Sequence, residues 1–200
     1  MQGLVSMHHF YLCQHVGFGN QYVYYDQGGT SLGKCEGNRY KKKTLLSKVF
    51  NLLGFHTLHS HFYSVVEETG DVILYIEKGE GIKSDFQTFD SDRHSLHTFK
   101  KTFQLDQPQV HIMDEQGKKA GALKGDLQGY EIELINEHRD PIMKVSKKRL
   151  PSNVKDLSSA GDTYEVTIKE DVDPKMRLSL LAFPVFYDIL FFRENHVPGS

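Results

Sequence analysis

The chain contains few of the residues that define several common classes of protein. Among its 200 residues there are two cysteines, Cys13 and Cys35, and no tryptophan. Two cysteines that form no C-x-x-C pair argue against a disulfide framework and a cysteine-rich zinc site, and they favour a reducing, intracellular setting. The first residues lack the basic region and the uninterrupted apolar region of a secretory signal. We therefore expect a cytoplasmic protein.

Neither sign of charge is in large excess. Lys and Arg together number 24, and Asp and Glu number 26. A balanced chain creates no global field that attracts nucleic acid, so we expect no nucleic-acid partner. Any electrostatic partner must be bound by a local patch.

The chain also lacks a hydrophobic run long enough to cross a membrane. Its most apolar stretch runs from Leu178 to Phe192 and includes Pro184 and Asp188. That stretch is short, because a spanning helix needs about 20 largely uncharged residues. An isolated carboxylate in lipid is also costly. We expect no transmembrane segment.

Most of the remaining sequence consists of short runs rich in Tyr, Val, Ile and Phe, separated by Gly, Asp or Asn turns. Such runs are typical of strands joined by hairpins. Turns are predicted at residues 26–29, 69–71, 114–117 and 136–140, and further strands at residues 85–89, 97–105 and 163–169. The total of about ten to twelve strands, with no helix between successive strands, predicts an all-β meander or barrel. We expect a chain of this length to form one domain, residues 1–200.

Two segments depart from this pattern of short strands and turns. Residues 39–55 place their leucines, Val49 and Phe50 on one arc of a helical wheel, which predicts a short amphipathic helix near residues 42–53. We expect it to pack over an open end of its own sheet rather than on lipid. The second segment, residues 176–194, is apolar on nearly every face, as a helix surrounded by protein would be. A barrel of about twelve strands is wide enough to hold it.

The end of the chain also carries a family resemblance. A strand led by Tyr164 precedes an Asp-x-Asp-x-Lys-Met turn at residues 171–176, and Asp188 stands before a Phe-Phe pair in the apolar helix. In these elements the chain resembles phospholipid scramblases and LURP-one-related proteins, both grouped with the tubby C-terminal domain. The resemblance implies a closed antiparallel barrel of about twelve strands over residues 20–194, enclosing a hydrophobic helix at about residues 175–192. Residues 1–20 are not covered by it.

Within this fold, some residues are expected to form the structural core. Asp188 would have to be hydrogen-bonded, paired or protonated inside the barrel. We expect it to anchor the helix end to a barrel strand or to Arg193. The expected core residues of the helix are Leu178, Leu181, Phe183, Phe186, Asp188 and Phe191.

The resemblance also implies two binding sites. Scramblases are proposed to bind calcium through acidic residues before the helix, and the matching positions are Asp162, Asp171 and Asp173. Ala160 stands where that pattern has its first acid, and turn-forming or capping carboxylates are the favoured alternative. Tubby relatives suggest phosphoinositide binding by a basic surface. The matching residues are Arg39, Lys41, Lys42, Lys43, Lys147, Lys148 and Arg149. The alternative for these is a solvated edge that blocks aggregation.

Catalysis has little support in the sequence. His56, His59 and His61 form the densest histidine cluster, but no accompanying spacing indicates a metal or nucleophile site. We expect a non-enzymatic binding module without a cofactor, unless calcium binds. The leading hypothesis is peripheral binding of anionic phospholipid at a membrane surface. A scaffold for an unknown protein partner and calcium-dependent, scramblase-like lipid handling are the alternatives.

Overall fold

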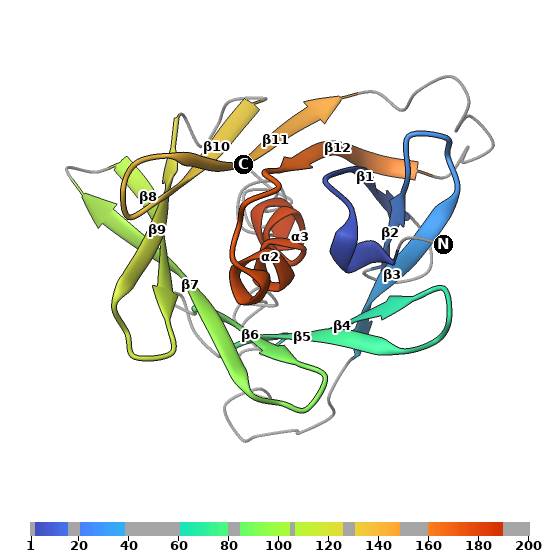
Figure 1. The fold of residues 1–200 in the computed structure, drawn as a ribbon, viewed down its shortest axis with the longest axis horizontal. Helices are drawn as coiled ribbons and strands as arrows, with labels where there is room; N and C mark the ends of the chain where they lie inside the picture. Colours follow the sequence, from blue (N-terminus) through green and yellow to red (C-terminus); the bar gives the residue numbers. More distant parts are fainter. Residues whose placement is uncertain are drawn as a thin grey trace, which may run out of the picture.

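A closed barrel of twelve antiparallel strands surrounds a helix in the computed structural model (Figure 1). The structure describes residues 3–15, 21–38, 61–79, 85–104, 107–125, 131–148 and 160–189. The strands are β1 His9–His15, β2 Gln21–Tyr25, β3 Ser31–Asn38, β4 His61–Glu67, β5 Val72–Lys78, β6 Phe86–Asp90, β7 Ser95–Gln104, β8 Gln107–Asp114, β9 Lys119–Lys124, β10 Glu131–Asn136, β11 Pro141–Lys148 and β12 Ala160–Ile168. This confirms the predicted architecture.

The first strand closes the barrel. Each strand pairs with the next along the chain, and β1 pairs with β12 in the register that places Phe10 opposite Val166 and Leu12 opposite Tyr164. The barrel therefore begins at His9, and not near residue 20 as the resemblance implied. A short 3-10 helix, η1 Leu4–Ser6, precedes β1 and buries Leu4 in the core.

The two ends of the barrel differ. One end, which we call the turn end, carries five tight hairpin turns and the β12–α2 connection; these are residues 26–30, 67–71, 90–94, 114–118, 136–140 and 169–173. The other end, which we call the far end, is where β1, β3, β5, β7, β9 and β11 finish. Each of the five hairpin turns at the turn end closes with the same pair of backbone bonds, as when Asp26 N donates to Thr30 O at 2.9 Å and Gly29 N donates to Asp26 O at 3.1 Å.

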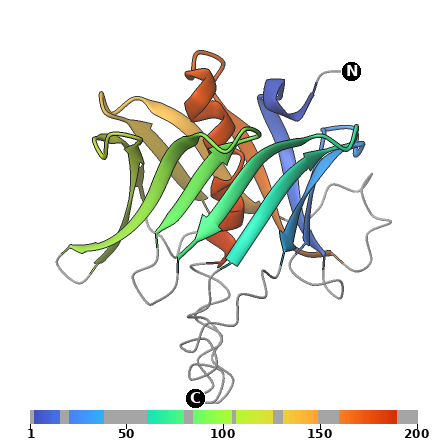
Figure 2. The same cartoon turned by 90° about the horizontal axis from the view of Figure 1, so that it is seen from below.

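The central helix runs along the barrel axis from the turn end toward the far end (Figure 2). It consists of α2 Pro174–Leu180 and α3 Phe183–Asp188, which lie close to the expected range of residues 175–192. The helix is bent between them, because Pro184 has no N–H to continue the backbone ladder. Tyr24 of the wall donates its hydroxyl to the Leu181 carbonyl at this bend, at 2.9 Å. Phe191, and the amphipathic helix expected near residues 42–53, lie outside the described residues.

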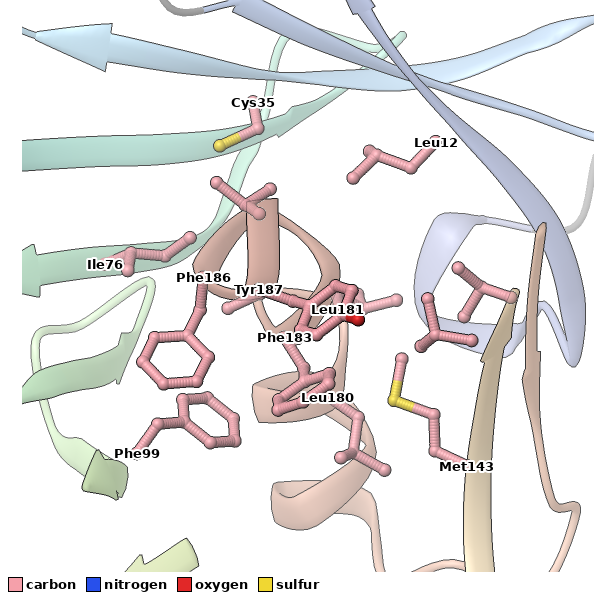
Figure 3. Packing of buried hydrophobic residues seen from close by; sticks show 14 of the residues in the cluster. Leu12, Cys35, Ile76, Phe99, Met143, Leu180, Leu181, Phe183, Phe186 and Tyr187 are labelled. Carbon is pink, nitrogen blue, oxygen red and sulfur yellow. The ribbon is translucent and has the colours of Figure 1, made fainter. Parts of the chain in front are cut away.

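The core fills the space between the helix and the wall. Phe183 and Phe186 turn toward Phe99 of β7, with ring centroids 5.5 and 5.4 Å from it (Figure 3). Leu181, Phe183 and Phe186 are fully buried, and Leu178 is partly buried against the core. The alternation of strand residues directs every second side chain onto this helix. Within the described residues, the helices are too short or too polar to span a membrane.

Candidate functional site

A buried carboxylate joins the helix to the wall near the far end. Asp188 closes α3 and is 1% exposed. Its two oxygens accept hydroxyl hydrogen bonds from Tyr22 of β2 and Tyr164 of β12, each at 2.6 Å. Both distances lie at the short end of the usual range for O–H···O hydrogen bonds. Burial, followed by the Asp188 charge, raises the pKa of Tyr164, so this hydroxyl stays a donor. The structure thus contains the expected anchoring of Asp188 to barrel strands.

A second polar cluster joins the other half of the helix to the wall. Ser179 of α2 is fully buried and lies 2.9 Å from Nδ1 of His97 and 3.0 Å from the Thr88 hydroxyl. Thr88 in turn donates to the His97 carbonyl at 2.9 Å. Burial lowers the pKa of His97, which favours a neutral ring. The cluster satisfies the polar groups that the wall and the helix bury against each other, and it offers no open face for a substrate.

Arg177 fixes the start of the helix. Its guanidinium is buried and donates to the backbone carbonyls of Lys169 and, at 3.1 Å, of Glu170. It also donates to the Met7 carbonyl at 3.4 Å. One side chain therefore holds together the end of β12, the start of α2 and the segment before β1.

The three carboxylates predicted to bind calcium do not meet in the structure. Asp162 lies on β12 near the far end, whereas Asp171 and Asp173 lie at the turn end beyond the same strand. Asp173 caps α2 by accepting the backbone N–H groups of Lys175 and Met176 at 2.9 and 3.2 Å. Capping was the favoured alternative for such residues. Calcium binding by this set stays a prediction without a shared site.

The basic residues predicted to bind lipid fall mostly outside the described side chains. Arg39, Lys41, Lys42, Lys43 and Arg149 are not described, and for Lys148 only the backbone is. Lys147 is described, and its Nζ lies 2.7 Å from Oδ2 of Asp162. The pair is partly buried, with side chains 20% and 36% exposed. One residue of the predicted lipid site therefore neutralises one residue of the predicted metal site.

The other predicted or potentially reactive side chains give less evidence of a functional site. His56 and His59 lie outside the described residues, and of His61 only the backbone at the start of β4 is described. Cys13 and Cys35 are buried and form no disulfide, and burial raises the pKa of Cys13 to about 11, which disfavours the reactive thiolate. In the described part of the chain, one group of potential metal ligands, Asp90 with Asp92 and His94, lies close together on an exposed turn.

Comparison with known proteins places this architecture in a family. The model of the family described as LURP-one-related matches residues 8–183. The chain belongs to the LURP-one-related family. This family is part of the tubby-like superfamily and is generally non-enzymatic. A search of curated proteins finds no match.

A solved structure shares the fold of this LURP-one-related chain. It is the X-ray structure of a protein from Arabidopsis thaliana, with a TM-score of 0.52 and 16% sequence identity. The alignment covers 94% of this chain and 98% of the plant protein. At this identity, the similarity establishes the barrel and its helix.

Several of these contacts were not anticipated from the sequence. Tyr164 was predicted there to lead a strand and His97 to begin another, and Tyr22 was not singled out. No local pattern pairs a tyrosine with a carboxylate so distant along the chain. A weak signal was available for Tyr22 and Tyr24, which alternate as inward-facing aromatics carrying hydroxyls that must find partners when buried.

Proposed function

We propose that this LURP-one-related chain is a non-enzymatic binding module that attaches peripherally to anionic phospholipid head groups on the cytoplasmic side of a membrane. Its contact surface is the basic patch, defined as Arg39, Lys41, Lys42, Lys43, Lys148 and Arg149. Lys147 stands beside this patch in its ion pair with Asp162.

The order of the strands carries the proposal. β3 ends at Asn38 and β11 ends at Lys148, and both strands run from the turn end to the far end. The two halves of the basic patch, although far apart in sequence, therefore follow strands that finish at the same end of the barrel. Four strand spacings separate β3 from β11, or about 19 Å across the strands. A planar, anionic surface can contact both at once.

The chemistry of the patch suits head groups. Lys and Arg offer several donors to phosphate oxygens. A cluster of such residues gains about 1 kcal/mol for each charge near an anionic leaflet. Lys41, Lys42 and Lys43 alone would supply about 3 kcal/mol, which corresponds to about a hundredfold in the partition coefficient.

Co-sedimentation with vesicles tests this function. The protein should bind vesicles of phosphatidylcholine that contain phosphatidylglycerol, should bind pure phosphatidylcholine far less, and should bind less as the salt concentration rises. Replacing Lys41, Lys42 and Lys43 with Glu should remove at least a hundredfold of the affinity. Equal binding to both kinds of vesicle, or full binding by the triple variant, would refute the proposal.

A second candidate function, protein interaction, is favoured by the outer wall of β4 and β5. The rings of Phe62 and Tyr75 stack with centroids 5.6 Å apart, and the Arg93 guanidinium lies 3.6 Å from the centroid of the Tyr75 ring. Tyr and Arg are enriched among the residues that dominate protein interfaces. If a protein partner binds here, Tyr75→Ala should abolish its binding while the lysine variant retains it, as measured by affinity capture and mass spectrometry.

A further inference from the structure

Negative charge is concentrated at the turn end of the barrel. The six segments of the turn end hold 13 of the 26 carboxylates but only 4 of the 24 Lys and Arg residues. The carboxylates are Asp26, Glu67, Glu68, Asp71, Asp90, Asp92, Asp114, Glu115, Glu137, Asp140, Glu170, Asp171 and Asp173. The turn end therefore carries an excess of nine negative charges on a chain whose net charge is -2.

Turn chemistry accounts for only part of this excess. In four of the five hairpin turns the side chain of the first residue accepts backbone N–H groups, as Asp114 does from Gln116 and Lys118 at 3.0 and 2.7 Å. Asn136 does the same in its own turn without a charge, at 2.9 Å. A carboxylate is therefore not required there. Asp92, Glu170 and Asp171 are exposed and are not the first residues of these turns.

The opposite sign predominates elsewhere. Outside the six segments of the turn end, the sequence holds 20 of the 24 Lys and Arg residues and 13 of the 26 Asp and Glu residues. The barrel wall keeps the two ends apart. The run from Asp71 to Gly79 along β5, at about 3.3 Å per residue and a strand tilt of about 40°, separates the ends by about 20 Å along the axis.

We propose that the barrel meets an anionic bilayer end-on, with its far end against the head groups and its turn end facing solvent. This orientation rests on the proposed function and adds to it the direction of approach. A bilayer surface attracts the far end and repels the turn end. The attraction and the repulsion together align the barrel axis with the membrane normal. The outer wall around Tyr75 then stays free of the membrane.

Labels at both ends of one strand test the orientation. Thr69 lies in the turn before β5, and Gly79 directly follows β5 at the far end. Both positions are exposed, and a Cβ at Gly79 would meet nothing within 4 Å. In Thr69→Cys and Gly79→Cys, a fluorophore attached to the new thiol reports on its position, while the native Cys13 and Cys35 are buried.

Quenching by lipids that carry a spin label on the head group separates the outcomes. With phosphatidylglycerol vesicles, the label at residue 79 should be quenched on binding, and the label at residue 69 should not. Equal quenching at both positions, or stronger quenching at residue 69, would overturn the end-on orientation while leaving lipid binding intact. Failure of both labelled proteins to bind the vesicles would overturn the proposed function itself, and the orientation with it.

Neutralising the turn end provides an independent test. The screening length in 0.15 M salt is about 8 Å, well below the separation of about 20 Å. Combined Asp92→Asn, Glu170→Gln and Asp171→Asn should therefore change the partition coefficient by less than about twofold. If the turn end faced the bilayer, removing these three negative charges would raise the partition coefficient by about a hundredfold. That result would contradict the proposal.

Discussion

Replacing Asp188 with Leu should destabilise the fold strongly. The hydroxyls of Tyr22 and Tyr164, both buried, would lose the carboxylate that accepts them at 2.6 Å. A buried polar group without its partner costs about 1 to 3 kcal/mol. The two hydroxyls together predict a loss of about 4 kcal/mol in the free energy of unfolding.

Replacing the two tyrosines tests whether the lost hydrogen bonds cause the destabilisation. Changing both tyrosines to Phe in the Asp188→Leu background removes the two hydroxyls that have lost the carboxylate. Replacing a hydrogen-bonded buried cluster with apolar side chains of similar shape has an effect on stability that is close to neutral. The triple variant should therefore recover about 2 to 4 kcal/mol relative to Asp188→Leu alone. Urea unfolding followed by far-ultraviolet circular dichroism measures each value. Unchanged stability of Asp188→Leu, or no recovery in the triple variant, would refute this account of the anchor.

Two further predictions concern the wall. Because burial lowers the pKa of His97 in the folded state below its ordinary value near 6.5, the unfolded chain binds more protons there. The stability that His97 contributes should be present above pH 6.5 and should be lost as the pH falls below that value. The urea concentration at the unfolding midpoint should therefore fall between pH 8 and pH 5.5, and it should fall less in His97→Gln. An equal fall in both proteins would contradict this. Gly33→Ala should lower the unfolding free energy by about 1 to 3 kcal/mol, because its Cβ would clash with the Val66 carbonyl oxygen. Gly79→Ala, with open space around the new Cβ, is the control and should be near neutral; equal stability of the two variants would contradict the packing argument.

Local chemistry made most of the hairpins predictable. Turns at Gly29, Gly70 and Gly117 can be located from sequence because glycine adopts the positive φ that each turn needs, 85°, 92° and 77°. Two turns have an arginine at this position, Arg93 and Arg139, each with a φ of 68°. The turn at residues 136–140 was still predicted, whereas the turn between β6 and β7, which contains Arg93, was not named from the sequence. The Arg93 side chain stacks on Tyr75, a tertiary contact that no local pattern reveals.

Barrel closure and the buried site depended on pairings between distant residues. β1 alternates Phe10 and Leu12 toward the core, which was a usable signal, but its partner β12 is the last strand of the chain. The sequence located Asp188 on an enclosed helix and required a partner for it, yet could not choose Tyr22 and Tyr164 from among the strand aromatics. The helix itself was predictable, since a segment apolar on all faces needs an enclosing wall.

The candidate binding residues were predicted less well than the fold. The resemblance assigned Lys147 to the lipid site and Asp162 to the metal site, but the two side chains form an ion pair. They meet because the register of β11 on β12 places Lys147 opposite Tyr164, and Asp162 lies close to Tyr164 on β12. Register is set by the whole barrel and not by the local sequence. The length of β12 likewise separates Asp162 from Asp171, which a linear motif would keep together.

The measurement that tests the central claim most directly compares two variants of equal net charge. One carries Glu at Lys41, Lys42 and Lys43 in the basic patch; the other carries Glu at Lys118, Lys169 and Lys175, all exposed at or beside the turn end. If the far end binds the membrane, the first variant should have a partition coefficient on phosphatidylglycerol vesicles about a hundredfold below that of the second. Equal partition coefficients would show that net charge alone controls binding, and would contradict the claim that this barrel binds anionic lipid through its basic patch.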